Sequence, residues 1–280
     1  MLTTKRKWIA VAVFAAFVLL CTLLSIFKIP KNSSFAYESV AQFEGRTISG
    51  VSAKMPTASA KIFLDSYFGV SFGSYSPCDD FITALAALDN KKVSAIWVAD
   101  VTADYYCRTG NYRSISPEET AGKGSERLQF AFAFRPEDTA LRDIANELLD
   151  GLEADGTLDR LYDYYVNGVE SSCLCPEFDN DGKTIYVGIT GTVPPLEMVD
   201  AEGNVSGMAV ELSKYLANYV GLNVKFVVLD NETAFARLMN GRVDMIACYG
   251  TSENHSTEFP EYIMSRGYCS MLEYRLLVTK

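Results

Sequence analysis

The chain has 280 residues, of which 49% are hydrophobic and 21% charged, and its formal net charge is −10 at pH 7. This composition is typical of globular proteins and excludes a disordered chain, a collagen and a coiled coil. Because a body this acidic repels phosphate backbones, we also exclude nucleic acid as a partner.

The first predicted element is a membrane-spanning helix. Residues 8–27 form a run of 20 residues without a charge, and at about 1.5 Å per helical residue this run matches a hydrocarbon core of about 30 Å. The Lys-Arg-Lys at residues 5–7 favours a cytoplasmic amino terminus. We therefore predict that residues 1–30 form a single-pass anchor in the cell membrane and that the body lies outside the cytoplasm. Cleavage of this segment as a signal peptide, or lipidation at Cys21, is the alternative.

Residues 31–128 are predicted to form an α/β unit. The apolar pattern alternates between strand-like and helical periods, which is typical of a sheet covered by helices. The predicted strands are residues 46–52, 70–75 and 93–98, and the predicted helices are residues 58–67 and 79–88.

Residues 129–170 are predicted to be a strand followed by two helices. The strand covers residues 129–134, and the first helix shows leucine or isoleucine on one face from Leu141 to Leu152. Asp155-Gly156 separates it from the second helix, and residues 171–182, which have no apolar period, are predicted to be a linker.

Residues 183–280 are predicted to form a second α/β unit. Its predicted strands are residues 184–189, 224–229 and 243–247, its predicted helices are residues 210–220 and 232–239, and residues 268–279 are predicted to be extended.

Six cysteines lie in the body, and their connectivity is open because six cysteines allow 15 pairings. Their intervals suggest that Cys78 pairs with Cys107 and Cys248 with Cys269, whereas buried free thiols are the alternative. The Cys-Leu-Cys at residues 173–175 is too tightly spaced for a zinc knuckle, and the chain has one histidine. We therefore expect no metal site and no cofactor.

Residues 184–250 carry several motifs in order: V-G-x-T, P-P, D-x-x-G-x-x-x-G, G-L-x-V-x-F and L-x-x-G-x-V-D. In this order they resemble the opening lobe of the extracellular solute-binding proteins of the polar amino acid type (family 3, type II periplasmic-binding-like fold). Residues 138–166, with A-D-G-T-L-D-R-L-Y, resemble the closing helices of this family, and residues 43–128 resemble its other lobe. The resemblance implies an α/β, two-lobed, periplasmic-binding-protein-like clamshell.

The order of the parts differs from that of the family. The second lobe comes first, the return strand and closing helices follow, and the first lobe comes last. We interpret this order as a circular permutation in which residues 168–182 join the old termini, since termini that lie close together at a surface tolerate it. A tandem pair of truncated lobes is the rival interpretation.

The candidate binding site follows from the rule that open α/β sheets bind ligands at the carboxyl ends of their strands. The rule selects the loops after the strands that end near Ser52, Val98, Ile189 and Ala247. The candidate ligand-binding residues in and beside these loops are Thr190, Pro195, Leu196, Glu197, Tyr249, Gly250, Thr251, Met55, Thr57 and Asp100.

Two departures from the family concern the groups that bind an amino acid. The resemblance places the acid for the ligand's amine at Ala99, one residue before Asp100. Because side chains of a strand alternate between its faces, an amine site survives only if Asp100 is in register. The family's arginine for the ligand's carboxylate is also missing, since no arginine follows Gly250-Thr251 before Arg266, and His255 does not replace a bidentate guanidinium.

The sequence therefore predicts an extracytoplasmic protein that captures a small polar solute, an amino acid or amine-like compound, for an ABC-type importer or a sensory partner. The alternative is a degenerate clamshell without ligand that acts as a sensor or interaction module in a membrane signalling system. With a single histidine, no nucleophile–base pair is discernible, so we expect no catalytic residue and no enzyme activity.

Overall fold

The computed structural model of the protein describes residues 37–51, 56–117, 128–171, 173–180, 182–230, 233–252 and 261–280. Within these ranges, no helix is both long enough and apolar enough to cross a membrane. The predicted anchor, residues 1–30, lies outside the described residues. The described chain contains two larger sheets and a two-stranded hairpin.

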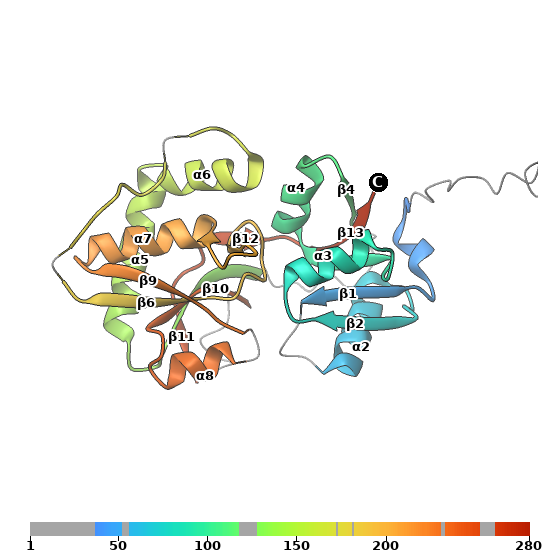
Figure 1. Cartoon of the computed structure of the whole chain (residues 1–280), viewed down its shortest axis with the longest axis horizontal. Helices are drawn as coiled ribbons and strands as arrows, with labels where there is room; N and C mark the ends of the chain where they lie inside the picture. The colour runs from blue at the N-terminus through green and yellow to red at the C-terminus, as the bar shows by residue number, and fades with distance from the viewer. Residues whose placement is uncertain are drawn as a thin grey trace, which may run out of the picture. The chain divides into compact units, whose positions relative to one another are not determined.

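The first sheet has five strands in the order β2-β1-β3-β13-β4 (Figure 1). We call residues 37–117 and 272–280, which contain it, the five-stranded lobe. In this sheet β1 runs parallel to β2 and β3, and β13 runs antiparallel to β3 and β4. The strands are β1 (Thr47–Val51), β2 (Ser74–Cys78), β3 (Ala95–Ala99), β4 (Tyr112–Ile115) and β13 (Tyr274–Thr279).

Helices cover both faces of this sheet. One face buries Ile48 and Leu276 under Leu64 of α2, and the other buries Ile96 and Leu277 under Leu88 of α3. Neighbouring residues of β13 therefore serve opposite faces, as the pleat requires. The helical elements are a 3₁₀ turn η1 (Val40–Phe43), α2 (Thr57–Phe68), α3 (Phe81–Asp89) and α4 (Asp100–Arg108).

The second sheet has six strands, with the order β11-β5-β10-β6-β9 and with β12 also paired to β5. We call residues 128–271 the six-stranded lobe. Here β6 is parallel to β9 and β10, whereas β5 is antiparallel to β10, β11 and β12. The strands are β5 (Leu128–Phe134), β6 (Thr184–Ile189), β9 (Asn223–Val228), β10 (Met245–Ser252), β11 (Ile263–Met264) and β12 (Cys269–Met271), and the hairpin is β7 (Met198–Val199) with β8 (Val205–Ser206).

The core of the six-stranded lobe lies between the sheet and its long helices. Leu149 of α5, Leu212 of α7 and Phe132 of β5 are fully buried in one apolar cluster. α5 ends at the predicted break, where Gly156 has a φ of 76° that favours glycine. The helical elements are α5 (Thr139–Ala154), α6 (Thr157–Tyr162), a π-helical turn η2 (Asp163–Asn167), α7 (Met208–Tyr219) and α8 (Ala234–Met239).

Each sheet combines strands from both sides of the predicted linker, residues 171–182. The last strand of the chain, β13, lies between β3 and β4 of the five-stranded sheet. Conversely β5, which precedes the linker, lies between β11 and β10, which follow it. The predicted α/β class with two sheet-based lobes is confirmed. The interleaving is compatible with the permuted order, which stays a prediction.

The structure corrects two of our expectations. The strand expected at residues 70–75 is β2, Ser74–Cys78, because Pro77 is tolerated at the edge of the sheet. The two suggested disulfides are not formed, and all six cysteines of the described body are free thiols. For Cys248 and Cys269 the reason is that β10 and β12 both pair with the intervening strand β5. Two strand spacings, about 9 to 10 Å, exceed the reach of a disulfide.

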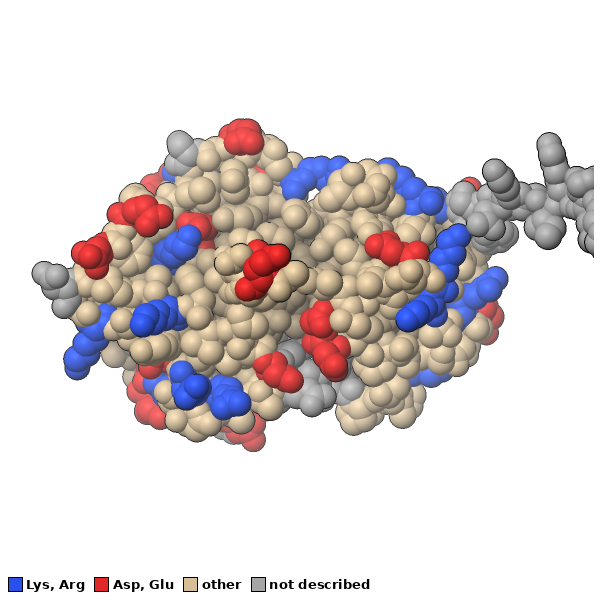
Figure 2. Space-filling model, viewed as in Figure 1, with Lys and Arg blue, Asp and Glu red and all other residues tan. Residues whose placement is uncertain are grey.

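On the face shown in Figure 2, acidic and basic side chains are interspersed in separate small groups. This face therefore presents no continuous basic field for a phosphate backbone.

Candidate functional site

A cavity of about 210 Å³ lies where the two lobes meet. The five-stranded lobe contributes the ends of β1 and β3, the start of β13 and parts of α3 and α4, and the six-stranded lobe contributes β5, the loop after β6, and the ends of β10 and β12. The lining residues are Val51, Phe81, Trp97, Val98, Ala99, Thr102, Leu128, Gln129, Phe130, Thr192, Val193, Gly250, Thr251, Met271 and Tyr274.

Trp97 and Tyr274 form the aromatic wall of the cavity on the five-stranded lobe. Their ring centroids are 4.7 Å apart at an interplanar angle of 68°, an edge-to-face contact. The Trp97 indole lies against Gly50, where an added Cβ would come within 2.0 Å of Nε1. Trp97 Nε1 donates a hydrogen bond to Tyr75 Oη at 3.4 Å, and Tyr75 Oη donates to the Gly50 carbonyl at 3.1 Å. Because Gly50 has no side chain, there is room for the indole at this position.

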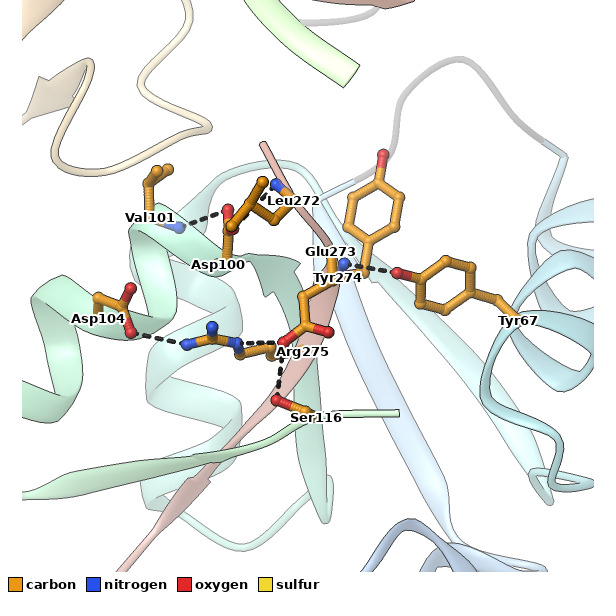
Figure 3. Close-up of polar contacts among 9 residues, drawn as sticks. All are labelled: Tyr67, Asp100, Val101, Asp104, Ser116, Leu272, Glu273, Tyr274 and Arg275. Atoms are coloured by element: carbon orange, nitrogen blue, oxygen red, sulfur yellow. Dashed lines mark hydrogen bonds and ion pairs between the residues drawn. The ribbon is translucent and has the colours of Figure 1, made fainter. Parts of the chain in front are cut away.

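The residue after Tyr274 points to the opposite side of β13 (Figure 3). Arg275 forms ion pairs with Asp104 at 2.7 Å and with Glu273 at 2.8 Å. Tyr274 lines the cavity, and its backbone N–H donates to Tyr67 Oη at 2.9 Å. Burial raises the pKa of the Tyr274 hydroxyl to about 12. The alternation of the strand thus places an uncharged ring in the cavity and the guanidinium outside it.

Asp100 is the first residue of α4 and is only 5% exposed. Its carboxylate accepts hydrogen bonds from the backbone N–H groups of Val101 and Leu272, both at 2.9 Å (Figure 3). Its own N–H donates to the carbonyl of Glu273 at 3.0 Å. Burial raises the pKa of this carboxyl. Asp100 therefore fixes the segment through which the chain crosses between the lobes, and Ala99 is the residue that lines the cavity.

Glu197 organises the loop after β6. It is fully buried, and its carboxylate accepts hydrogen bonds from the N–H groups of Thr190 and Thr192, each at 3.2 Å, and from the Thr190 hydroxyl. Burial raises the pKa of this carboxyl. The loop continues through a cis peptide bond before Pro195 to the fully buried Leu196. Thr192 and Val193 of this loop line the cavity, whereas the candidates Thr190, Pro195, Leu196 and Glu197 are not part of the lining.

Of the candidates at the end of β10, two line the cavity and one does not. Gly250 and Thr251 line the cavity. Tyr249 lies in a different apolar cluster and packs against Phe235 and Tyr262, with ring centroids 4.9 and 5.4 Å apart. Thr57 is exposed at the start of α2 and does not line the cavity. Met55 lies outside the described residues.

Arg266, the first arginine after Gly250-Thr251, does not line the cavity. Its guanidinium pairs with Asp150 at 2.8 Å and with Glu153, and donates to the Leu149 carbonyl at 3.0 Å, all on α5. Among the described residues that line the cavity, none carries a formal charge.

The aromatic lining residues were not among the candidates, although one of them, Trp97, leaves a signal in the sequence. Trp97 is two residues before Ala99 on one strand, so the register that brings Ala99 to the cavity brings Trp97 to the same face. Phe130 is paired with Gly250 across β5 and β10, a long-range register that the sequence alone does not reveal.

Residues 185–271 match the bacterial extracellular solute-binding proteins, family 3. This part of the chain is thus similar to that family. The matched range runs from β6 to β12 and includes Thr192, Val193, Gly250, Thr251 and Met271 of the cavity.

Two other proteins share part of this sequence. A probable amino-acid ABC transporter-binding protein of Haemophilus influenzae is 30% identical over 100 residues, which are 35% of this chain and 37% of the relative. A probable ABC transporter arginine-binding protein, ArtJ, of Chlamydia trachomatis is 26% identical over 110 residues, 39% of this chain and 42% of the relative. The chain thus spans less than half the length of these relatives.

Solved structures give low similarity scores. An ancestral arginine-binding protein bound to arginine has a TM-score of 0.43 and 14% identity over 85% of this chain and 86% of that protein. The BvgS VFT2 domain of Bordetella pertussis has a TM-score of 0.40 and 13% identity over 84% of this chain and 80% of the domain. Scores of this size add nothing to the description of the fold or the site.

Proposed function

We propose that this protein captures a small solute outside the cytoplasm, in the cavity between its two lobes. The observation that carries the proposal is the origin of the lining, to which both sheets contribute near the segment, Leu272–Glu273, that joins β12 to β13. A ligand in this cavity contacts both lobes at once, so its binding energy favours the arrangement in which the lobes meet. The match of residues 185–271 to solute-binding proteins supports this function.

The partner that we propose is the permease of an ABC-type importer. The names of the two relatives, both ABC transporter-binding proteins, support it. We further propose that residues 1–30 hold the protein at the outer side of the cell membrane and that the protein binds its solute without chemical conversion. The test is a reporter enzyme that works only in the cytoplasm, fused to Lys280. Activity of this reporter would contradict the proposed orientation.

The alternative function is a clamshell that has lost solute binding and serves as an interaction module. The observation that favours it is the uncharged lining of the cavity. Ala99 stands where the family's carboxylate is expected, and the Arg266 guanidinium is paired with Asp150 of α5. The two functions differ in one measurable property, namely whether any small solute binds at the cavity.

The decisive experiment is a thermal-shift screen of the full chain in detergent against amino acids, amines and uncharged aromatic compounds. A ligand at one hundred times its dissociation constant adds about 2.7 kcal/mol to the free energy of unfolding. The variant Gly250→Val should remove the shift, because an added Cβ makes only ordinary contact with Phe130 and the larger side chain occupies the cavity. Gly151→Ala on α5, where the added Cβ meets nothing within 4 Å, is the control. The absence of a shift throughout the screen, or an unchanged shift in Gly250→Val, would contradict solute capture.

A further inference from the structure

We propose that the cavity selects an uncharged solute with an aromatic ring over a charged amino acid. This inference rests on the proposed function, solute capture between the lobes, and specifies the class of its ligand. It follows from the chemistry of the lining and from the contacts of Asp100 and Arg275, the charged residues that directly follow the lining residues Ala99 and Tyr274.

The lining favours a flat apolar ring. Four aromatic residues contribute to it, and Val51, Val98, Leu128 and Met271 add aliphatic surface. Aromatic rings prefer edge-to-face or offset contacts with centroids about 4.5 to 7 Å apart, and the Trp97–Tyr274 pair is already held in such a contact. The polar side chains of the lining are Thr102, Thr192, Thr251 and Gln129, all of them uncharged, and an amide such as that of Gln129 both donates and accepts hydrogen bonds.

Two lining residues, Ala99 and Tyr274, are each followed directly by a charged residue that already has partners of its own. The Asp100 carboxylate is bound by the N–H groups of Val101 and Leu272. The Arg275 guanidinium is bound by Asp104 and Glu273, and Ser116 Oγ donates a further hydrogen bond to Glu273 at 2.8 Å (Figure 3). An ammonium or carboxylate that entered the cavity would lose its hydration without gaining an ion pair from the described lining, which is unfavourable.

At two neighbouring positions, a residue of the lining is followed directly by a charged residue whose partners lie outside the lining. At the end of β3, Ala99 faces the cavity and Asp100 faces the crossing segment. At the start of β13, Tyr274 faces the cavity and Arg275 faces α4. These two positions are partners in the sheet, since Tyr274 pairs with Ala99 and Arg275 with Val98. Ala99 and Tyr274 are thus neighbours in the uncharged wall, and each is followed by a charge that is bound elsewhere.

A matched set of ligands isolates the effect of charge. Benzamide, benzoate and benzylamine share one ring and are neutral, anionic and cationic at pH 7, and L-arginine represents a charged amino acid. The full chain with Trp8→Phe keeps Trp97 as its sole tryptophan, so its fluorescence reports on the cavity. We expect benzamide to bind at least about tenfold more tightly than each charged compound.

The possible outcomes separate this inference from solute capture itself. If L-arginine, benzoate or benzylamine binds as tightly as benzamide or more tightly, the neutral-ligand inference is wrong and solute capture stands. If none of the four compounds binds, the neutral-ligand inference is also wrong, and the broader screen then decides solute capture independently.

Installing a carboxylate in the cavity should reverse the preference. In Ala99→Asp we expect benzylamine to gain at least about tenfold in affinity relative to benzamide, because the new carboxylate faces the ligand. Thr57→Asp adds the same charge at an exposed position outside the lining and should leave the ratio unchanged. Since Ala99 is buried, Val193→Asp, on the half-buried loop of the cavity, provides a second variant if Ala99→Asp does not fold. If the affinity ratio of benzylamine to benzamide is unchanged in folded Ala99→Asp or in folded Val193→Asp, the inference is wrong.

Discussion

At the scale of single residues, the buried carboxylates of this protein position backbone segments. Asp100 binds two N–H groups and thereby joins the start of α4 to the crossing segment. Glu197 binds N–H groups at Thr190 and Thr192 and so shapes the loop that carries Val193 into the cavity. Both were candidate ligand contacts in the sequence. A carboxylate that binds a ligand and a carboxylate that binds backbone N–H groups can each follow the end of a strand. Residue type and position in the sequence therefore do not distinguish the two roles.

The Glu197 carboxyl should make stability depend on pH. Burial raises its pKa in the folded protein above the ordinary value of 4.5, so between these two values the folded state binds more protons than the unfolded state. Relative to Glu197→Gln, which does not titrate, the wild-type free energy of unfolding should fall as pH rises from about 4.5 through the raised pKa. Urea unfolding of both proteins between pH 4 and pH 8 measures this difference. Glu202→Gln, at an exposed hairpin position, controls for net charge. If the wild-type free energy of unfolding instead rises with pH relative to that of Glu197→Gln, the predicted sign is wrong.

At the scale of elements, the sequence predicts best those helices and strands whose own residues show a clear apolar period. The helices at residues 139–154 and 208–219 and the strands at 128–134 and 184–189 lie within a few residues of their predicted bounds. α4 and β4 had no prediction. α4 contains Val, Thr and Tyr, which favour strands, and it is held by the burial of Val101 and Ala103. β4 exists because it pairs with β13, about 160 residues later in the chain, a contact with no local signal.

α4 also links the two lobes through Arg108. Its guanidinium donates to the carbonyls of Val166 at 2.9 Å and Tyr165 at 3.4 Å, at the end of η2. Gly168 follows with a φ of 70°, and a Cβ there would lie 2.3 Å from Arg108 Nη1. A cation at the carboxyl end of a helix is favourable because the last carbonyls lack N–H partners.

We therefore expect Arg108→Ala to lower the free energy of unfolding by about 1 kcal/mol. Urea denaturation at two salt concentrations measures the change, and the part that comes from the helix dipole should shrink at high salt. Arg142→Ala on α5, whose guanidinium pairs only with the exposed Asp143 among the contacts seen for it, is the matched control and should cost about 0.5 kcal/mol or less. Equal effects of the two substitutions would remove the role of Arg108 as a link.

At the scale of the whole molecule, the main property is that neither half of the chain contains a complete sheet. The part before the linker lacks β13, and the part after it lacks β5. A strand within a sheet, as both are, leaves its neighbours' backbone groups without partners when it is removed. This favours a single cooperative body over a tandem pair of truncated lobes.

The permutation hypothesis predicts that the family order can be restored. β13 is antiparallel to β3 and β1 is parallel to it, so the end of β13 and the start of β1 lie at the same end of the sheet, two strand spacings apart. A flexible linker of about ten residues spans that distance of about 10 Å. A chain that begins at residue 183, continues from Lys280 through this linker to Tyr37 and ends at residue 170 should therefore fold. We expect one cooperative unfolding transition, because joining these ends changes loop entropy by only about 1 kcal/mol. Retention of the ligand found for the wild type would show that the cavity is intact. Two separate transitions in the wild-type and reordered chains would instead favour the tandem interpretation, in which each part folds by itself.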